Sequence, residues 1–314
     1  MISFRRASVV LALSVLISCF LGSAILTAST AQNNAERVSD TILCSVFPIF
    51  ALAREIASGS HLSIDLLLPA DLGCPHHYAL TPGDFSRLSK ARVLVMSGLG
   101  FEPFVGRLTQ DAASLPRIVC ASGLPTIVSA DEPGEINAHV FTTPAGIISM
   151  GNNLAVQLAT IDPTGTDLYK KNAANLGDQL APLVKAFSEL AAQTASLPVI
   201  LTHDSLDYLA RDLGLRVIAR LGEDSSGETS ELSVKRLTEL VNLIRRERPL
   251  AILIDGTAIS PISATLIRET GIYSINLPLL TTGEENPSPD FLRRHFEKMF
   301  QLLSKLVEIK KEMR

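Results

Sequence analysis

The chain is 314 residues long, with 46% hydrophobic residues and a formal net charge of −4 at neutral pH. This length and composition are ordinary for a globular protein with one large or two medium domains. The charge balance excludes the strongly basic surface that nucleic-acid binding needs, and no internal period of about 20 to 50 residues indicates a solenoid.

Residues 1–31 have the pattern of an export signal peptide. Arg5 and Arg6 form a positively charged start, an apolar run follows at 7–26, and small residues offer a cleavage site after Ala31. We therefore expect a periplasmic or otherwise extracytoplasmic mature protein. Two alternatives stay open: the apolar run can remain as an uncleaved anchor, and Cys19 can carry a lipid, although the apolar residues that continue after it argue against a lipid anchor.

Cysteine usage predicts no disulfide framework. After the signal only Cys44, Cys74 and Cys120 remain, an odd number at scattered positions. We therefore expect at least one free thiol, even in an oxidising compartment.

Short β-branched and leucine-rich runs alternate with helical patterns along the rest of the chain, which is typical of parallel α/β construction. In the first half we predict strands at 41–46, 63–68, 92–96 and 117–120, and helices near 50–58 and 83–90. Thr81 as N-cap, Pro82 at the first helical position and Asp84 in the first turn mark the start of the second helix. Residues 37–162 are expected to form an N-terminal α/β lobe.

A long helix is predicted between the two halves. From residue 163 to residue 196, apolar side chains recur at alternating spacings of four and three, which is a helical stripe. Such a helix would span roughly 45 to 50 Å at about 1.5 Å per residue. Gly177 and Pro182 weaken the pattern, and Pro182 is a potential kink. We expect a stiff spine along both lobes, which would let them move only slightly when a ligand binds.

Residues 197–314 are expected to form a C-terminal α/β lobe. Its predicted elements are strands at 199–202, 216–219, 250–254 and 273–275, helices near 206–213, 234–246 and 261–270, and a terminal helix from about residue 289. The predicted fold class is therefore α/β, with two lobes that each contain a mainly parallel sheet flanked by helices and are joined by one long spine helix.

Four of the six histidines lie in a loop or just beyond a predicted strand: His76, His77, His139 and His203. In open α/β sheets, ligands bind outside the carboxyl ends of the strands, so these histidines converge on the natural crevice. Any single histidine is more often an ordinary hydrogen-bonded side chain, but several at such positions in both halves indicate a metal site. His61 and His295 lie in a turn and on the terminal helix, and we assign them no site role.

Four ordered segments carry a family resemblance. Residues 75–84 read P-H-H-Y-A-L-T-P-G-D, 95–102 read V-M-S-G-L-G-F-E, 138–144 read A-H-V-F-T-T-P, and 202–210 read T-H-D-S-L-D-Y-L-A. They are similar to P-H-x-Y-x-x-x-P-x-D, N-G-x-G-x-E, D-P-H-V-W-x-x-P and H-D-A-F-x-Y-x-A in the metal-binding proteins of zinc and manganese ABC importers. This resemblance covers nearly all of the mature chain.

The resemblance implies the site and the partner. It implies that His76, His139 and His203 are the first, second and third metal ligands, and that the partner is the permease of a membrane ABC importer. Two departures matter. The family's fourth ligand is commonly an aspartate in a D-P-L or D-x-L segment, where this chain has Leu277, and leucine cannot coordinate a metal. The histidine-rich loop of many zinc members is replaced by a short acidic segment at 129–137.

Three imidazoles favour Zn²⁺ and tolerate copper or nickel, whereas Mn²⁺ prefers carboxylate oxygens, so we expect zinc rather than manganese. Three neutral ligands leave the charge of the metal uncompensated in a partly buried cleft. Asp255, at the end of the strand at 250–254, is our candidate for the fourth ligand or for an acceptor of a histidine N–H, and its alternative role is a helix N-cap or a solvated acid. Further candidates, each given less weight, are Glu223, Asp224, Glu228, Glu284, Glu285, His77 and Cys74.

The predicted function is that of an extracytoplasmic solute-binding protein, a monomer without catalytic residues, which captures zinc between its lobes and delivers it to an ABC importer. Two alternatives stay open. A zinc-dependent hydrolytic enzyme can use three histidines to acidify bound water, but neither H-E-x-x-H nor G-x-S-x-G occurs. An adhesin-like family member with vestigial metal binding is supported only by Leu277.

Overall fold

The computed structural model describes residues 39–72, 75, 78–108, 114–130, 134–222, 234–256 and 258–313. Residues 1–39 and 40–314 form separate units, and the description below concerns the second. Several features predicted from the sequence lie outside the described residues: the export signal with Cys19, and Cys74, His76, His77, Glu223, Asp224 and Glu228. Among the helices within the described ranges, none has both the length and the apolar character that a membrane span requires.

The first sheet contains four parallel strands in the order β2-β1-β3-β4. These strands are β1 (Thr41–Cys44), β2 (Ser63–Leu66), β3 (Val93–Met96) and β4 (Arg117–Val119). The central strands β1 and β3 are apolar and largely buried, as expected where helices cover both faces of a parallel sheet, whereas the edge strand β2 alternates between exposed and half-buried side chains. The four strands predicted in the first half are confirmed.

The second sheet repeats the same arrangement, with the order β6-β5-β7-β8. Its strands are β5 (Pro198–Leu201), β6 (Arg216–Arg220), β7 (Ala251–Asp255) and β8 (Tyr273–Leu277). All five residues of β7 are buried, and Asp255 at its end lies opposite Leu277 of β8 in the parallel register. Because the strands are parallel, their carboxyl ends share one edge of the sheet, and His203 follows β5 at this edge.

With the exception of α5, the helices lie close to the predicted positions. They are α2 (Phe47–Ile56), α3 (Pro82–Leu88), α5 (Pro144–Ile161), α6 (Thr166–Thr194), α7 (Asp207–Asp212), α8 (Val234–Glu247), α9 (Pro261–Thr270) and α10 (Phe291–Glu312). The predicted start of α3 is confirmed as a reciprocal capping box, in which the Thr81 hydroxyl accepts from the Asp84 N–H and the Asp84 carboxylate accepts from the Thr81 N–H.

Helix α5 is absent from the sequence-based prediction. Two glycines and an Asn-Asn pair lower its intrinsic helix propensity. However, the Thr143 side chain accepts from the Gly146 N–H, and Pro144 occupies the first turn. The helix therefore begins with a Thr-Pro pair, as α3 does with Thr81 and Pro82. A Cβ atom at Gly151 would lie 3.1 Å from Leu176 of α6, so this glycine allows the two helices to approach closely. Gly151 thus weakens the helical pattern in the sequence and permits the packing of α5 against α6.

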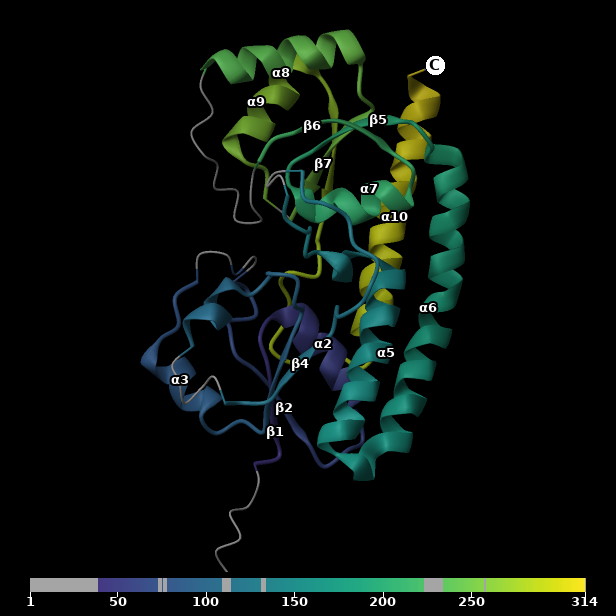
Figure 1. Ribbon diagram of the computed structural model, residues 1–314. Coiled ribbons are helices and arrows are strands. Elements are labelled where there is room, and N and C mark those ends of the chain that lie inside the picture. The colour runs from purple at the N-terminus through teal and green to yellow at the C-terminus, as the bar shows by residue number, and fades with distance from the viewer. Residues whose placement is uncertain are drawn as a thin grey trace, which may run out of the picture. The chain divides into compact units, whose positions relative to one another are not determined.

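Two long helices, α6 and α10, run alongside both sheets (Figure 1). Helix α6 contributes Leu176 and Leu180 to the core around the first sheet, and Phe187 to the core around the second. Helix α10 contributes Phe296 to the first core and Leu303 to the second. The predicted spine helix is therefore confirmed and continues through Pro182. The terminal helix adds a second continuous connection, which stiffens the link between the two sheets.

Near the start of α10, the carboxyl group of Glu55 lies in an environment that disfavours its charged form. Glu55 of α2 lines a cavity of about 120 Å³ together with the segment that leads into α10. Burial, followed by repulsion from Asp290, raises the pKa of Glu55 from 4.5 to about 7. Between these two pH values the folded protein holds a proton that the unfolded chain has released, so stability falls as the pH rises through this window.

Replacing Glu55 with glutamine should therefore stabilise the protein at alkaline pH. The amide resembles the protonated acid, so Glu55→Gln should change little at pH 4.5 and should raise the free energy of unfolding by about 1 to 2 kcal/mol at pH 8. Urea unfolding at both pH values measures this, with the exposed Glu308→Gln on α10 as the control. A Glu55→Gln protein that is less stable than wild type at pH 8 would contradict the account.

Candidate metal centre

The structure brings His139 and His203 together from opposite halves of the chain. Their ring centroids are 5.5 Å apart, and the rings are nearly perpendicular, at 87°. His139 lies at the start of a short 3-10 helix, Val140–Thr142, whose side chains belong to the first core. His203 follows β5, whose Leu201 belongs to the second core. The two imidazoles therefore meet at the junction of the two cores, while His76, the third predicted ligand, lies outside the described residues.

Neighbouring residues fix the orientation and the tautomer of His139. The side chain is buried, with Phe101 and Phe141 in edge contact at 5.3 and 5.9 Å between ring centroids. Asn137 Oδ1 accepts the backbone N–H of His139 and lies 3.0 Å from Nδ1. Asn137 Nδ2 donates to the Asp204 carbonyl at 2.8 Å, which rules out the flipped amide. Nδ1 therefore carries the hydrogen, and Nε2 keeps the lone pair that a metal requires.

Asp204 is a site residue that the sequence reasoning missed. Its Oδ1 lies 3.3 Å from His203 Nδ1 and 3.6 Å from His139 Nδ1, and its Oδ2 accepts from Ser129 Oγ at 2.8 Å. Among the described residues, His139, His203 and Asp204 form the group whose potential ligand atoms all lie within 4.8 Å of one another. The available signal was its position directly after His203 in the H-D motif.

Asp255 lies beside this group rather than within it. The carboxylate is buried, and its Oδ2 accepts from Ser205 Oγ at 2.5 Å. The Ser205 N–H in turn lies 3.2 Å from His203 Nδ1. Ser205 therefore links Asp255 to His203, and the neighbouring position on β8 is filled by the fully buried side chain of Leu277.

A small hairpin joins the two halves at the site. Val128 and Ile136 form an isolated antiparallel bridge, in the segment where the family resemblance places a histidine-rich loop. Its base is fixed to α7 by Tyr208, whose hydroxyl donates to the Asn137 carbonyl at 2.8 Å and accepts from the Ile127 N–H at 3.3 Å. Because Ser129 and Asn137 also bind Asp204, the hairpin positions His139 against the second half of the chain.

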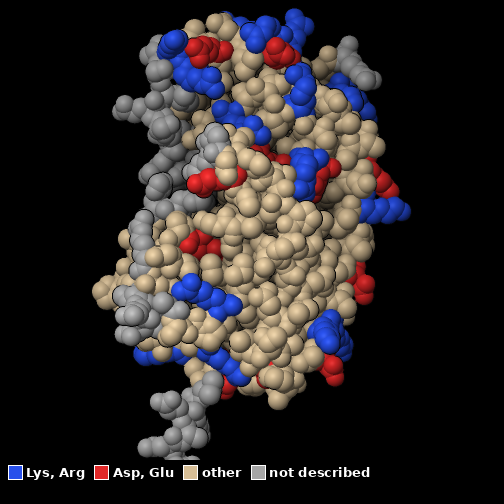
Figure 2. Space-filling view, in the orientation of Figure 1, with Lys and Arg blue, Asp and Glu red and all other residues tan. Residues whose placement is uncertain are grey.

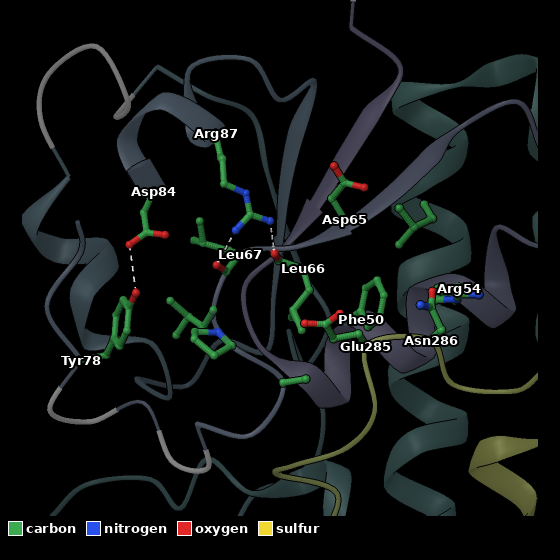
Figure 3. A pocket seen from close by; sticks show the side chains of 14 residues that line it. Phe50, Arg54, Asp65, Leu66, Leu67, Tyr78, Asp84, Arg87, Glu285 and Asn286 are labelled. Carbon is green, nitrogen blue, oxygen red and sulfur yellow. Dashed lines mark hydrogen bonds between the residues drawn. The ribbon is translucent and has the colours of Figure 1, made fainter. Parts of the chain in front are cut away.

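Hydrogen bonds hold described residues on both sides of position 76 in the sequence (Figure 3). Before it, Arg87 donates to the carbonyls of Leu66 and Leu67, the latter at 2.8 Å. After it, the Asp84 carboxylate accepts from the Tyr78 hydroxyl at 3.0 Å. These groups line an open pocket of about 540 Å³, together with Glu285, which the sequence reasoning had weighed as a minor candidate for the metal site.

Glu102 holds the turn that places Phe101 against His139. This buried carboxylate accepts from Ser45 Oγ at 2.7 Å and from the N–H groups of Ser97 and Gly98 at 2.6 and 3.0 Å. Burial raises the pKa of Glu102, and these three hydrogen bonds lower it in part. They close a turn in which Leu99 has a φ of 58°, and the turn delivers Phe101 to the edge of His139. The glutamate of the G-x-G-x-E motif therefore has a positioning role here.

Two further features bear on the sequence-based predictions. Cys44 and Cys120 are buried free thiols, which confirms the expectation of at least one free thiol.

On the face shown in Figure 2, acidic and basic side chains are interspersed rather than gathered into one basic patch.

Two parallel α/β units, a long connecting helix and a histidine pair at their junction define a two-lobed α/β protein with a candidate metal site between the two cores. Residues 42–308 match the family described as zinc-uptake complex component A periplasmic. The chain belongs to this family.

Named relatives and solved structures are similar to the chain at low identity. The zinc-binding lipoprotein AdcA of Streptococcus pneumoniae is 24% identical over 260 residues, which cover 78% of this chain and 51% of AdcA, so the chain spans about half the length of that relative. The high-affinity zinc uptake system protein ZnuA of Bacillus subtilis is 22% identical over 275 residues, 82% of this chain and 85% of that protein. The structure of the solute-binding protein FpvC of Pseudomonas aeruginosa with Ni²⁺ has a TM-score of 0.71 at 22% identity, covering 87% of this chain and 97% of FpvC. This structural likeness confirms the predicted fold.

Proposed function

We propose that the protein is an extracytoplasmic solute-binding protein that captures zinc at the junction of its two lobes and delivers it to the permease of an ABC importer. The observation that carries the proposal is the meeting of His139 and His203, from opposite halves of the chain, in a buried contact beside Asp204. Family membership and relatives named for zinc uptake and zinc binding support the same cargo. A relative named for manganese binding keeps manganese as the competing metal.

The proposed ligands are His76, His139 and His203, with Asp255 supplying negative charge. Imidazole nitrogens suit zinc better than manganese, and zinc–nitrogen bonds are about 2.0 to 2.1 Å long. Asp255 is close enough to act on His203 through Ser205. We assign residues 37–162 and 197–314 to the two lobes and residues 163–196 to the connecting helix.

The proposed location follows from the export pattern at residues 1–31 and from relatives described as periplasmic or as lipoproteins. An exported monomer that binds one metal ion needs a membrane partner to move its cargo inward, and the permease of an ABC importer fits that role. We assign the protein no catalytic residues.

Metal content tests the proposal directly. Protein purified from its native compartment without a chelator should contain about one zinc ion per chain by elemental mass spectrometry, because three imidazoles at one point favour this ion. A protein that carries manganese in place of zinc would overturn the choice of metal. A protein that carries no transition metal and takes up none on titration would overturn the function.

Zinc binding should also weaken in mild acid. Histidine coordinates a metal only in its neutral form, so several protons compete with one zinc ion as the pH falls. We expect the affinity measured by calorimetric titration to drop steeply between pH 7.5 and pH 5. A constant affinity over this range would show that carboxylates, and not the imidazoles of His139 and His203, hold the metal.

A further inference from the structure

One oxygen of Asp204 faces both imidazoles of the proposed site. Its Oδ1 lies 3.3 Å from Nδ1 of His203 and 3.6 Å from Nδ1 of His139. We propose that Asp204 is the carboxylate that serves both histidines when zinc is bound: it accepts from Nδ1–H of His203 and faces Nδ1–H of His139, whose hydrogen bond goes to Asn137, while each Nε2 binds the metal. This inference rests on the proposed function and adds to it a positioning residue that also supplies charge.

The charge of Asp204 is available to the site. In the described part of the chain, the basic groups that approach its carboxylate within 4.0 Å are the two histidines. Asp207, three residues later, is by contrast paired with Arg220 at 2.7 Å. Because the Asp204 side chain is about nine-tenths buried, its attraction for a divalent cation is screened less than that of a surface carboxylate.

The hydrogen bonds at His139 favour an indirect role over direct coordination by Asp204. Asn137 fixes the hydrogen of this ring on Nδ1, the same atom that faces Asp204. The metal must then bind Nε2 of His139, on the opposite side of the ring from the carboxylate. A carboxylate behind a metal-bound histidine fixes the ring orientation and raises the basicity of the ligand.

At His203 the proposed arrangement requires one hydrogen bond to be exchanged. The Ser205 N–H is directed at His203 Nδ1 at 3.2 Å, a contact that uses the lone pair of that nitrogen. Zinc at Nε2 places the hydrogen of the neutral ring on Nδ1, where Asp204 Oδ1 is the acceptor at 3.3 Å. Zinc binding should therefore replace the contact with Ser205 by a charge-assisted bond to Asp204, which is the stronger of the two.

Asp204 is also held across the junction of the two halves. Ser129 Oγ donates to its Oδ2 at 2.8 Å, and Asn137 Nδ2 donates to its carbonyl at 2.8 Å. Both donors belong to the hairpin that precedes His139. The carboxylate thus has one oxygen for the hairpin and one for the two rings, which fixes the distance between the proposed ligands before the metal arrives.

The tautomers of the two rings in the wild-type protein give the first test. Long-range ¹H–¹⁵N correlation spectra of the zinc-loaded protein distinguish a metal-bound nitrogen from a protonated one. Both His139 and His203 should show zinc on Nε2 and hydrogen on Nδ1. Zinc on Nδ1 of either ring would overturn the proposal, because that atom would then carry no hydrogen to face Asp204.

Substitution of the carboxylate gives the second test. Asp204→Asn keeps the size of the side chain and an acceptor for Ser129, but it removes the charge. It should lower zinc affinity about tenfold, the lower end of the range for such outer carboxylates, while zinc X-ray absorption shows the same number of nitrogen neighbours. The control, Asp178→Asn, removes one charge from the exposed face of α6 and should bind as wild type does.

The outcomes separate this inference from the proposed function. If wild-type protein binds zinc and His203→Ala weakens it, but Asp204→Asn binds as wild type, only the role of Asp204 is overturned. If wild-type protein binds no zinc, the function fails as well. Loss of a zinc ligand in the absorption spectrum of Asp204→Asn would show that Asp204 coordinates the metal directly, which also contradicts the proposal.

Discussion

Replacing His139 or His203 with alanine should weaken zinc binding by at least about a hundredfold, which corresponds to about 2.7 kcal/mol. Each substitution removes a proposed ligand, His139 from a buried position and His203 from a half-buried one, and leaves zinc with an incomplete coordination sphere. His76→Ala should have an effect of the same size if its loop places it at the same point. Competition titration with a zinc chelator measures these affinities.

His61 provides the matched control for these variants. Its side chain is 52% exposed and lies near Asp40 and Asp162, in contact with neither proposed ligand. His61→Ala should therefore bind zinc as wild type does. If His76→Ala were silent and His77→Ala destroyed binding, the alignment of the P-H-H-Y segment with its family motif would be wrong by one residue.

The second large expected effect on zinc affinity comes from the carboxylate charge near the proposed site, because this chain has Leu277 where the resemblance implies an aspartate. Asp255→Asn should lower zinc affinity about tenfold, because the amide keeps the hydrogen bond from Ser205 but removes a buried negative charge near His203. Leu277→Asp should raise the affinity, since it restores a carboxylate where the family commonly has one. The same substitution buries a charge beside Asp255 in the parallel register, so it should lower stability in the absence of zinc.

Combining the two substitutions tests whether they act through one deficit of charge. In the Asp255→Asn, Leu277→Asp double variant the new carboxylate has no charged neighbour on β7, so zinc affinity should return to the wild-type value or exceed it. Calorimetric titration of wild type and the three variants completes the cycle. An Asp255→Asn protein indistinguishable from wild type would remove Asp255 from the site.

Much of the fold follows from local patterns. The central strands β1, β3, β5 and β7 are short, mainly apolar runs, and α3 and α9 begin at Thr-Pro and Ser-Pro signals that fix their first turn. The stripe on α6 is regular enough to predict a helix through Pro182. The missing helix, α5, is the case in which glycine has two roles, because Gly151 lowers helix propensity while it allows α6 to approach.

The residues of the proposed site could be predicted one by one, but their arrangement could not. The positions of His139 and His203 in a loop and after a strand indicated the crevice, and the family motifs added their roles as ligands. Nothing in the spacing showed that Asn137 would set the tautomer of His139 or that Asp204 would face both rings. The hydrogen bonds that orient these two side chains, from Asn137 to the Asp204 carbonyl and from Ser129 to the Asp204 carboxylate, span 67 and 75 residues along the chain. Asp255 was chosen for its strand end, and its connection to His203 through Ser205 became visible only in three dimensions.

The most direct test of the central claim is the position of zinc in crystals of the zinc-loaded protein, located by anomalous diffraction at the zinc absorption edge. The account predicts one strong peak at the junction of the two cores, about 2.0 to 2.1 Å from Nε2 of both His139 and His203. A peak at any other place, with these two imidazoles bound to no metal, would contradict it.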